Sequence, residues 1–207
     1  MRAEMLDIEK ALAAEGFGVI AGVDEAGRGP FAGDVYAAAV ILPDGALIEG
    51  LDDSKKLTEQ KRDALFDEIQ RIAISYSIAT ATVAEIEEHN ILGATLLAMN
   101  RAISAVAPAS TEGFIAMIDG NQSRGIAFPN RTYTKGDSRS ASIAAASILA
   151  KVARDRYMVE MDARYPGYGF AKHKGYGTAA HTAAILQLGV TEIHRKKFLR
   201  KLLGGNG

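Results

Sequence analysis

The chain has 207 residues, of which 48% are hydrophobic and 24% are charged, and its net charge is −1. This composition is typical of a soluble globular protein built as one domain, or as one domain with a small appendage. The sequence contains no cysteine, which excludes a disulfide framework, a thiolate metal site and a cysteine nucleophile. It has neither an apolar stretch of the roughly 18 residues that span a membrane nor the apolar core of a secretory signal, so we expect a cytoplasmic protein.

The net charge is close to zero, but the charged residues are distributed unevenly along the chain. Residues 1–130 hold 10 Lys and Arg against 20 Asp and Glu, whereas residues 131–207 hold 14 against 5. A basic C-terminal third suits the binding of nucleic-acid phosphates, because each neutralised phosphate releases counterions. A solvated basic surface balanced by an acidic one would give the same distribution, so charge alone leaves both interpretations open.

Apolar runs and helical periodicities alternate along the first half of the chain. Runs that are apolar, or that alternate apolar with polar residues, predict strands over residues 17–23, 36–42 and 73–80. The first strand ends at Asp24 and Glu25, where glycines predict a tight turn. Helical spacing predicts a helix over residues 58–71, and the capping-box pair Thr82 and Glu85 predicts a long helix that ends near residue 106.

The second half of the chain continues this alternation and then changes in composition. The expected elements are strands over residues 113–118 and 131–135, and helices over residues 142–161 and 178–188. Strands that alternate with helices indicate an α/β fold with a sheet of mixed direction. From residue 166 onward the composition shifts to Gly, Lys, His and Tyr, so we expect a main domain at 1–165 and a small helical appendage at 166–207.

Acidic residues follow two of the predicted buried strands. Asp24 and Glu25 follow the first strand, Asp119 follows the strand at 113–118, and Asp137 stands just before the alanine-rich helix. Sites form at strand ends in open α/β sheets, and neighbouring carboxylates repel one another unless a hard cation such as Mg²⁺ neutralises them. The pattern therefore predicts a metal site, provided that the acids converge. Taken singly, each acid could instead close a turn or cap a helix.

The segment that contains the first two acids reads DEAGRGP, from Asp24 to Pro30. Glycines on both sides of Arg28 expose backbone N–H and C=O groups and allow a ligand to approach closely. No Gly-Lys-Ser or Gly-Lys-Thr follows, so the segment is not a P-loop. A glycine-rich turn with a solvated arginine is the alternative interpretation.

DEAGRGP strongly resembles the signature of the type 2 ribonucleases H, and of ribonuclease HII in particular. Further blocks stand in the order of that family: DSKKL at 53–57, IDGN at 118–121, KGD at 135–137, SIAAASILAKV at 142–152, RDR at 154–156, YGF at 168–170 and HKGYGT at 173–178. The blocks cover roughly residues 17–198, and so many ordered matches are far more specific than one short motif.

The resemblance implies a ribonuclease H-like fold, in which a mixed β-sheet is flanked by helices. It assigns a catalytic domain to residues 1–165 and a substrate-binding helical segment to residues 166–207. It also implies that a group of acids acts in catalysis and holds divalent metal, Mg²⁺ or Mn²⁺, with two ions expected when substrate is bound. These acids are Asp24, Glu25, Asp119 and Asp137.

The resemblance further implies which residues contact the substrate. Backbone groups of Gly27, Arg28 and Gly29 would read a ribose 2′-hydroxyl, and Tyr176 would pack on the deoxyribose that follows. Lys55 is similar to a family lysine near substrate phosphate. Asp155 looks like an acid of the outer shell close to the metals.

The implied activity is that of an endoribonuclease. It would cut the RNA strand of RNA–DNA hybrids and the bond 5′ to ribonucleotides embedded in duplex DNA, leaving 3′-hydroxyl and 5′-phosphate ends. These substrates connect the chain with ribonucleotide excision and DNA replication. We expect a monomer that binds hybrid and ribonucleotide-containing duplexes and no membrane, and contact with a replication clamp or polymerase stays open.

The sequence departs from the family pattern at three places. Asp34 stands where the family usually has a proline, next to the glycine-rich turn. The C-terminal block reads HRKKF at 194–198, in place of His-Arg-x-Ser-Phe, and residues 122–130 match weakly. None of these changes touches the four acids, so the expected chemistry is unaffected.

Two other functions are compatible with parts of this pattern. A nucleic-acid-binding module that kept the fold without the chemistry would have no reason to retain all four acids. A different nuclease of the same fold, such as a junction resolvase, would share the acids but not the Gly-Arg-Gly turn beside them. Cleavage of ribonucleotide-containing duplexes compared with all-DNA duplexes separates these functions from the ribonuclease.

Overall fold

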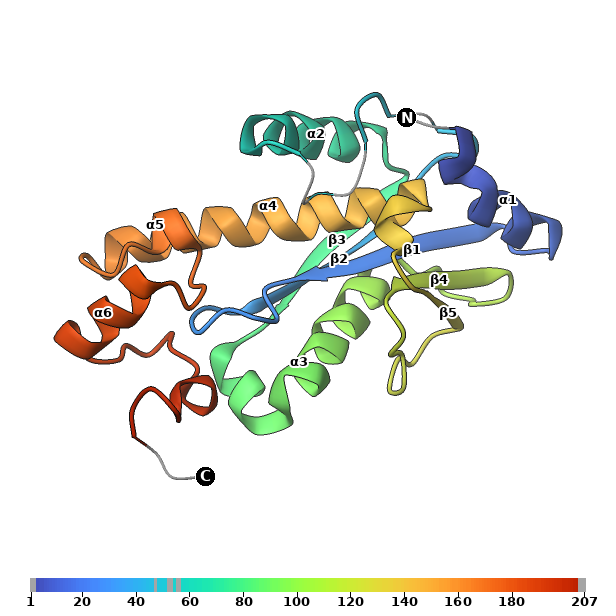
Figure 1. The fold of residues 1–207 in the computed structure, drawn as a ribbon. Helices are drawn as coiled ribbons and strands as arrows, with labels where there is room; N and C mark the ends of the chain where they lie inside the picture. The colour runs from blue at the N-terminus through green and yellow to red at the C-terminus, as the bar shows by residue number, and fades with distance from the viewer. Residues whose placement is uncertain (1–2, 47, 52–53, 55–56, 205–207) are drawn as a thin grey trace.

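A five-stranded mixed sheet forms the centre of the molecule (Figure 1). The computed structural model describes residues 3–46, 48–51, 54 and 57–204. The strands lie in the order β3-β2-β1-β4-β5, with β1–β2 and β2–β3 antiparallel and β1–β4 and β4–β5 parallel. Their bounds are β1 Val19–Ala26, β2 Val35–Ile41, β3 Ser75–Ala81, β4 Phe114–Asp119 and β5 Asn130–Tyr133.

Helices cover both faces of this sheet. The α-helices are α1 Asp7–Ala14, α2 Glu59–Ile72, α3 Val83–Val106, α4 Ala141–Arg164, α5 Phe170–His173 and α6 Ala179–Leu188, and the 3₁₀ turns are η1 Ala3–Leu6, η3 Gly136–Ser138 and η4 Lys196–Leu199. Figure 1 shows α3 on one side of the sheet, with α4 and α2 on the other. Within the described part of the chain, no helix is long and apolar enough to cross a membrane.

The alternation of side chains along β2 shows how the two cores arise. Ala37, Ala39 and Ile41 face the core that includes α3, whereas Ala38 and Val40 face the core that includes α4 and α2. Alanine lets the helices approach closely, as the run of alanines predicts. The closest approach is at Gly22, where an added Cβ would lie 2.1 Å from the carbonyl carbon of Ser142. The N-terminal turn of α4 therefore packs directly on the backbone of β1.

The expected strands and long helices are all present, including the capping box at Thr82 and Glu85. Sequence reasoning missed α1 and the single turn α5, which are short and bury few apolar side chains. It also ended the first strand too early. The parallel pairing of β1 with β4 stops at Val23, but its antiparallel pairing with β2 continues to Ala26. Asp24 therefore lies within a strand that is open on one side only.

The C-terminal segment packs against the far end of α4. A small core joins Phe170, Ile185 and Leu199 to Met158 of α4 and to Ala32 of the loop after β1. An isolated bridge between Ala32 and His194 makes the same connection through the backbone. Figure 1 places α5 and α6 beyond the end of the sheet, on the side where this loop lies. The C-terminal segment thus packs against the loop that follows β1.

Candidate active site

Three carboxylates from separate parts of the chain meet at one end of the sheet. Asp24 lies on β1, Asp119 ends β4, and Asp137 lies in η3, and one oxygen of each lies within 4.8 Å of the others. The strand register explains the first two, because Val23 pairs with Ile118 and the next residues are the acids. The sequence predicts a metal site here only if the acids converge, and the structure brings these three together.

Hydrogen bonds within the site hold these acids in place. The Oδ1 atom of Asp24 accepts the backbone N–H of Glu25 at 2.7 Å. The Oδ1 atom of Asp119 accepts the backbone N–H of Gly136 at 2.7 Å. Asp119 therefore fixes the turn that presents Asp137, and Ser140, rather than Asp137, caps α4.

The group is strongly unfavourable in the absence of a cation. Asp24 is 5% exposed and Asp137 is 4% exposed. Burial raises the pKa of Asp24 well above its ordinary value, and the charges of Glu25 and Asp119 raise it further. A divalent cation would offset both effects, and a set of oxygen donors without nitrogen or sulfur suits Mg²⁺ or Mn²⁺. The donors present therefore fit the expected metal.

Glu25 lies beside this group but is not part of it. Successive side chains of a strand point to opposite faces, so Asp24 faces Ser147 on α4 while Glu25 faces α3. There Glu25 lines a small cavity of about 40 Å³ together with Arg28, Asp119 and Leu92. The Oε1 atom of Glu25 lies 3.3 Å from Nη1 of Arg28. Glu25 thus borders the acid cluster from the side of the glycine-rich turn.

The glycine-rich turn, which we define as residues 27–34, is fixed by the buried side chain of Arg195. Its guanidinium donates to the carbonyl oxygens of Gly27, Arg28, Pro30 and Gly33 at 2.6–3.1 Å. Arg195 is 0% exposed. One side chain from the C-terminal segment thus organises nearly the whole turn.

A second buried arginine, Arg154 of α4, completes this support. It donates to the carbonyl oxygens of Ala32 and Asp34 and to that of Lys174, at 3.1–3.2 Å. The turn and the loop before Tyr176 are therefore tied to one guanidinium. The sequence pattern predicted no role for either arginine, because a basic, polar context does not indicate full burial.

Asp34, which replaces a common proline, has a definite place in this arrangement. Its Oδ1 atom accepts the backbone N–H of Val83 at 3.0 Å, at the start of α3. Burial raises its pKa, and the charges of Arg195 and Arg154 partly oppose that shift. Asp34 therefore places a carboxylate near two buried cations and joins the turn to α3.

The two glycines of Gly-Arg-Gly differ in what the fold requires of them. Gly27 has φ +99°, and an added Cβ would lie 2.1 Å from Nε of Arg154. Gly29 has no such conformation, and an added Cβ would meet only the Tyr176 ring, at 3.7 Å, an ordinary contact. The fold therefore requires glycine at 27 but tolerates a methyl group at 29, on the open surface between the turn and Tyr176.

Alanine substitutions separate these two requirements. We expect Gly29→Ala to keep the melting temperature of the wild type but to lose about 10² in cleavage rate, because a displacement of 1 Å at a reacting centre costs that much. Gly27→Ala should lower the melting temperature as well, since its side chain would displace Arg154. Thermal unfolding and cleavage rates of both variants check this. A fully active Gly29→Ala would remove the surface at Gly29 from substrate binding.

Tyr176 forms the other wall of this surface, and three histidines, two of them buried, pack behind it. Tyr176 is 45% exposed, and its backbone carbonyl accepts a hydrogen bond from Nδ1 of His181 at 2.9 Å. His181 in turn contacts His194 through their Nε2 atoms at 3.1 Å and stacks on His173. Burial lowers the pKa of His181 and lowers that of His194 to about 4, so both stay neutral and structural.

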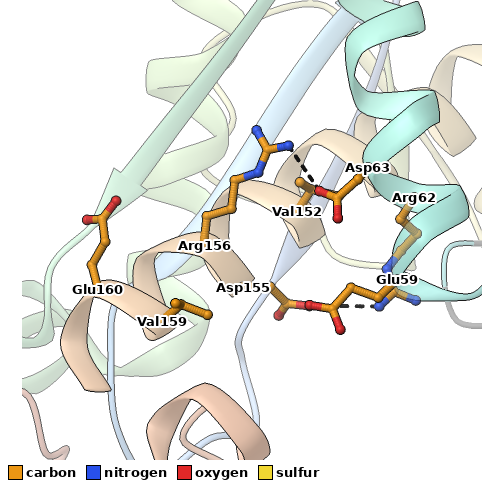
Figure 2. Close-up of a pocket in the computed structure, with 8 residues that line it drawn as sticks. All are labelled: Glu59, Arg62, Asp63, Val152, Asp155, Arg156, Val159 and Glu160. Atoms are coloured by element: carbon orange, nitrogen blue, oxygen red, sulfur yellow. Dashed lines mark hydrogen bonds and ion pairs between the residues drawn. The ribbon is translucent and has the colours of Figure 1, made fainter. Parts of the chain in front are cut away.

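Lys55 and Asp155 are the two remaining candidate residues. Lys55 lies outside the described residues, so the structure does not test its position. Asp155 lies on α4, where Nζ of Lys151 is 2.5 Å from its Oδ1 and Nη2 of Arg62 is 3.9 Å from its Oδ2. With Arg62 it lines a separate pocket of about 360 Å³ between α2 and α4 (Figure 2). Asp155 therefore contacts two cationic side chains, and its expected role near the metals stays a prediction.

The fold and the site together define a class of protein. A mixed sheet that brings carboxylates together across neighbouring parallel strands, with helices on both faces, is the arrangement of the ribonuclease H-like nucleases. The model of the ribonuclease HII family matches residues 21–201. The chain belongs to the ribonuclease HII family, whose members are metal-dependent endonucleases that cut the RNA of RNA–DNA hybrids.

Individual relatives and structures agree with this assignment. The chain is 55% identical to the ribonuclease HII of Geobacter sp. strain M21 over 195 residues, 94% of this chain and 84% of that one. It is 51% identical to ribonuclease HII of Geobacillus thermodenitrificans over 203 residues, 97% of this chain and 77% of that one.

Solved structures show the same fold at low sequence identity. The fold matches ribonuclease H2 of Pyrococcus horikoshii with a TM-score of 0.71 and 24% identity, over 89% of this chain and 96% of that one. It matches Bst-RNase HIII in complex with Mn²⁺ with a TM-score of 0.67 and 19% identity, over 94% of this chain and 72% of that one.

Proposed function

We propose that this chain cuts the RNA strand of RNA–DNA hybrids and the phosphodiester bond on the 5′ side of a ribonucleotide embedded in duplex DNA. Water attacks the phosphorus atom, and the products carry a 3′-hydroxyl and a 5′-phosphate. The observation that carries the proposal is the adjacency of two features on one strand end. The acid cluster at Asp24 is followed directly by the glycine-rich turn.

The acids supply the metal site in this proposal. Asp24, Asp119 and Asp137 hold divalent metal, with Glu25 adding a carboxylate from the side of the turn. The chemistry that two such ions, Mg²⁺ or Mn²⁺, would supply at these residues is activation of water and stabilisation of charge on the phosphate oxygens. The protein contributes fixed ligands, since Asp119 and Asp24 are both oriented by backbone N–H groups.

The turn supplies the recognition of ribose. Arg195 and Arg154 occupy its inward carbonyl groups, so its backbone cannot relax when a ligand arrives. A 2′-hydroxyl can both donate and accept, and a rigid surface at Gly27, Arg28 and Gly29 discriminates against a sugar that leaves its polar groups unpaired. Because the turn follows Asp24 directly, the position of the ribose fixes the position of the cut.

The C-terminal segment, residues 166–207, supplies the binding of the flanking strand. Tyr176 offers an exposed ring 3.7 Å from the place of a Cβ at Gly29. Lys172 is exposed on α5, and the segment carries half of the 14 Lys and Arg residues that follow residue 130. Phosphates of the DNA that follows the ribonucleotide would lie along this surface.

Cleavage of three labelled duplexes tests this function. We expect rapid cutting of an RNA–DNA hybrid and of a DNA duplex with one ribonucleotide, both dependent on Mg²⁺ or Mn²⁺, and no cutting of the all-DNA duplex. Binding without cleavage would indicate a nucleic-acid-binding module instead. Equal cleavage of the all-DNA duplex would indicate a nuclease that does not read ribose.

Tyr176→Ala should reduce cleavage most on the duplex with a single ribonucleotide. On that substrate the ring meets a deoxyribose directly after the ribose, and base or sugar stacking on an aromatic ring is worth about 1–3 kcal/mol. Tyr176→Phe keeps the ring and serves as the matched control. Kinetic constants on the single-ribonucleotide duplex and on the hybrid check the prediction, and equal losses on both would exclude a role in reading the junction.

A further inference from the structure

Glu9 of α1 contacts the first turn of α4 through one carboxylate oxygen. Its Oε1 atom accepts from the hydroxyl of Ser140 at 2.7 Å and from the backbone N–H of Ser142 at 3.1 Å. The Ser140 hydroxyl in turn accepts the backbone N–H of Ile143 at 3.2 Å. Two of the N–H groups that the start of a helix leaves without partners are therefore bonded, one by the cap residue and one by a side chain of another helix.

The second carboxylate oxygen of Glu9 shows that this contact has a cost. Among the described residues, Oε2 of Glu9 is buried and has no hydrogen-bond partner, and a buried acceptor left unpaired is unfavourable. Negative charge at the N-terminus of a helix is favourable, and Glu9 supplies it to α4. The bonds to α4 therefore hold Glu9 in a position that its second oxygen disfavours.

The turn that Glu9 contacts lies between two parts of the acid cluster. On one side, the backbone of Ser142 packs on Gly22 of β1, where an added Cβ would lie 2.1 Å from the Ser142 carbonyl carbon. Gly22 is two residues before Asp24 on the same strand. On the other side, the backbone N–H of Ser140 donates at 2.8 Å to the carbonyl oxygen of the residue that precedes Asp137. The start of α4 thus joins the strand that carries Asp24 to the turn that carries Asp137.

We propose that Glu9 is a positioning residue for the metal site, because it fixes the start of α4 and thereby the spacing of Asp24 and Asp137. This inference rests on the proposed function, in which both acids hold metal. Mg²⁺ demands nearly ideal octahedral geometry, whereas Ca²⁺ accepts more oxygen ligands in flexible arrangements. Loss of the Glu9 contact should therefore weaken the binding of Mg²⁺ more than the binding of Ca²⁺.

The experiment measures the binding of each ion to the folded protein without nucleic acid. Calorimetric titrations give the dissociation constants of Mg²⁺ and Ca²⁺ for the wild type and for Glu9→Ala, and thermal unfolding shows that each variant is folded. Loss of an outer partner of a metal ligand typically weakens metal binding by about 10–100-fold. Because Glu9 acts one contact further out, we expect the lower end, about tenfold, for Mg²⁺.

Two further variants separate the hydrogen bonds of Glu9 from its charge and from the anchoring of α1. Glu9→Gln keeps an oxygen that accepts from Ser140 and Ser142, so its Mg²⁺ affinity should stay near that of the wild type. Glu15→Ala is the matched control. It removes an acid from the end of α1, where both oxygens of Glu15 accept from the guanidinium of Arg131, and it should change the affinity for neither ion.

The outcomes distinguish positioning from a general loosening of the site. A selective loss of Mg²⁺ affinity in Glu9→Ala, restored in Glu9→Gln and absent in Glu15→Ala, supports the inference. Equal losses for both ions in Glu9→Ala overturn it. Wild-type Mg²⁺ binding by a folded Glu9→Ala, or a Glu9→Gln as weak as Glu9→Ala, also overturns it.

Ser140→Ala keeps the inference testable if Glu9→Ala does not fold. This variant removes the hydroxyl that Glu9 contacts and leaves the bond from Ser142 in place. We expect the same selective loss of Mg²⁺ affinity, and an equal loss for both ions or no loss would overturn the inference. A wild type that binds neither ion and does not cut the single-ribonucleotide duplex contradicts the proposed function instead.

Discussion

We expect Asp24→Asn to abolish cleavage, lowering its rate by at least about 10³-fold, while the protein stays folded. Metal at such a site is worth several kcal/mol in the transition state, and each 1.4 kcal/mol is a factor of ten. Asparagine keeps the shape and one oxygen, which can still accept the N–H of Glu25, but it removes the charge that holds the cation. Single-turnover cleavage of the hybrid with Mg²⁺ present measures the effect.

The stability of this variant provides an internal control. Because the folded pKa of Asp24 is raised, the metal-free protein loses stability as pH rises from the ordinary Asp value through the raised one. Asp24→Asn removes that loss, so its melting temperature at neutral pH without metal should equal or exceed that of the wild type. Asp67→Asn, at an exposed position on α2, controls for the loss of one charge. Full activity of Asp24→Asn would remove Asp24 from the chemistry.

Arg195→Ala has the second largest expected effect, and it acts on both stability and activity. The change leaves four carbonyl groups of the turn without their donor, and each unsatisfied buried group costs about 1–3 kcal/mol. Water entering the space restores part of this, so we expect a loss of about 3 kcal/mol and a fall in melting temperature of roughly 6–12 °C. Thermal unfolding and cleavage rates measure the two losses.

Two controls show whether the shape of the guanidinium matters. Arg195→Lys keeps a cation but cannot reach four carbonyls from a fixed fork, so cleavage should stay low even below the melting temperature. Arg71→Ala removes an exposed arginine from the last turn of α2, outside the proposed substrate-binding segment, and should change neither quantity. Wild-type cleavage by a folded Arg195→Lys would show that the turn needs only a positive charge beneath it.

The acids could be predicted from the sequence because their signal is local. A buried apolar run precedes both Asp24 and Asp119. Such a run predicts a strand, and sites in open α/β sheets form where strands end. The local pattern around Asp137 does not show that it meets the other acids. The structure brings it to them, because the backbone N–H of Gly136 donates to Oδ1 of Asp119. Glu25 faces the opposite side of the sheet from Asp24 because β1 continues to Ala26.

The support of the site could not be predicted because its contacts are long-range. Arg195 reaches carbonyls more than 160 residues earlier in the chain, and Ser147 meets Ser54 across 93 positions. A basic residue between polar neighbours indicates an exposed surface on local grounds. The burial of Arg195 follows only from the packing of the C-terminal segment on α4 and the glycine-rich turn.

The position and chemistry of the cut on a single-ribonucleotide duplex test the central claim most directly. If water attacks at the acid cluster while the turn reads the ribose, the break lies on the 5′ side of the ribonucleotide and leaves a 3′-hydroxyl and a 5′-phosphate. Mass spectrometry of both fragments distinguishes these ends. A break on the 3′ side that leaves a 2′,3′-cyclic phosphate would contradict the account, because the 2′-hydroxyl would then be the nucleophile rather than the group that is recognised.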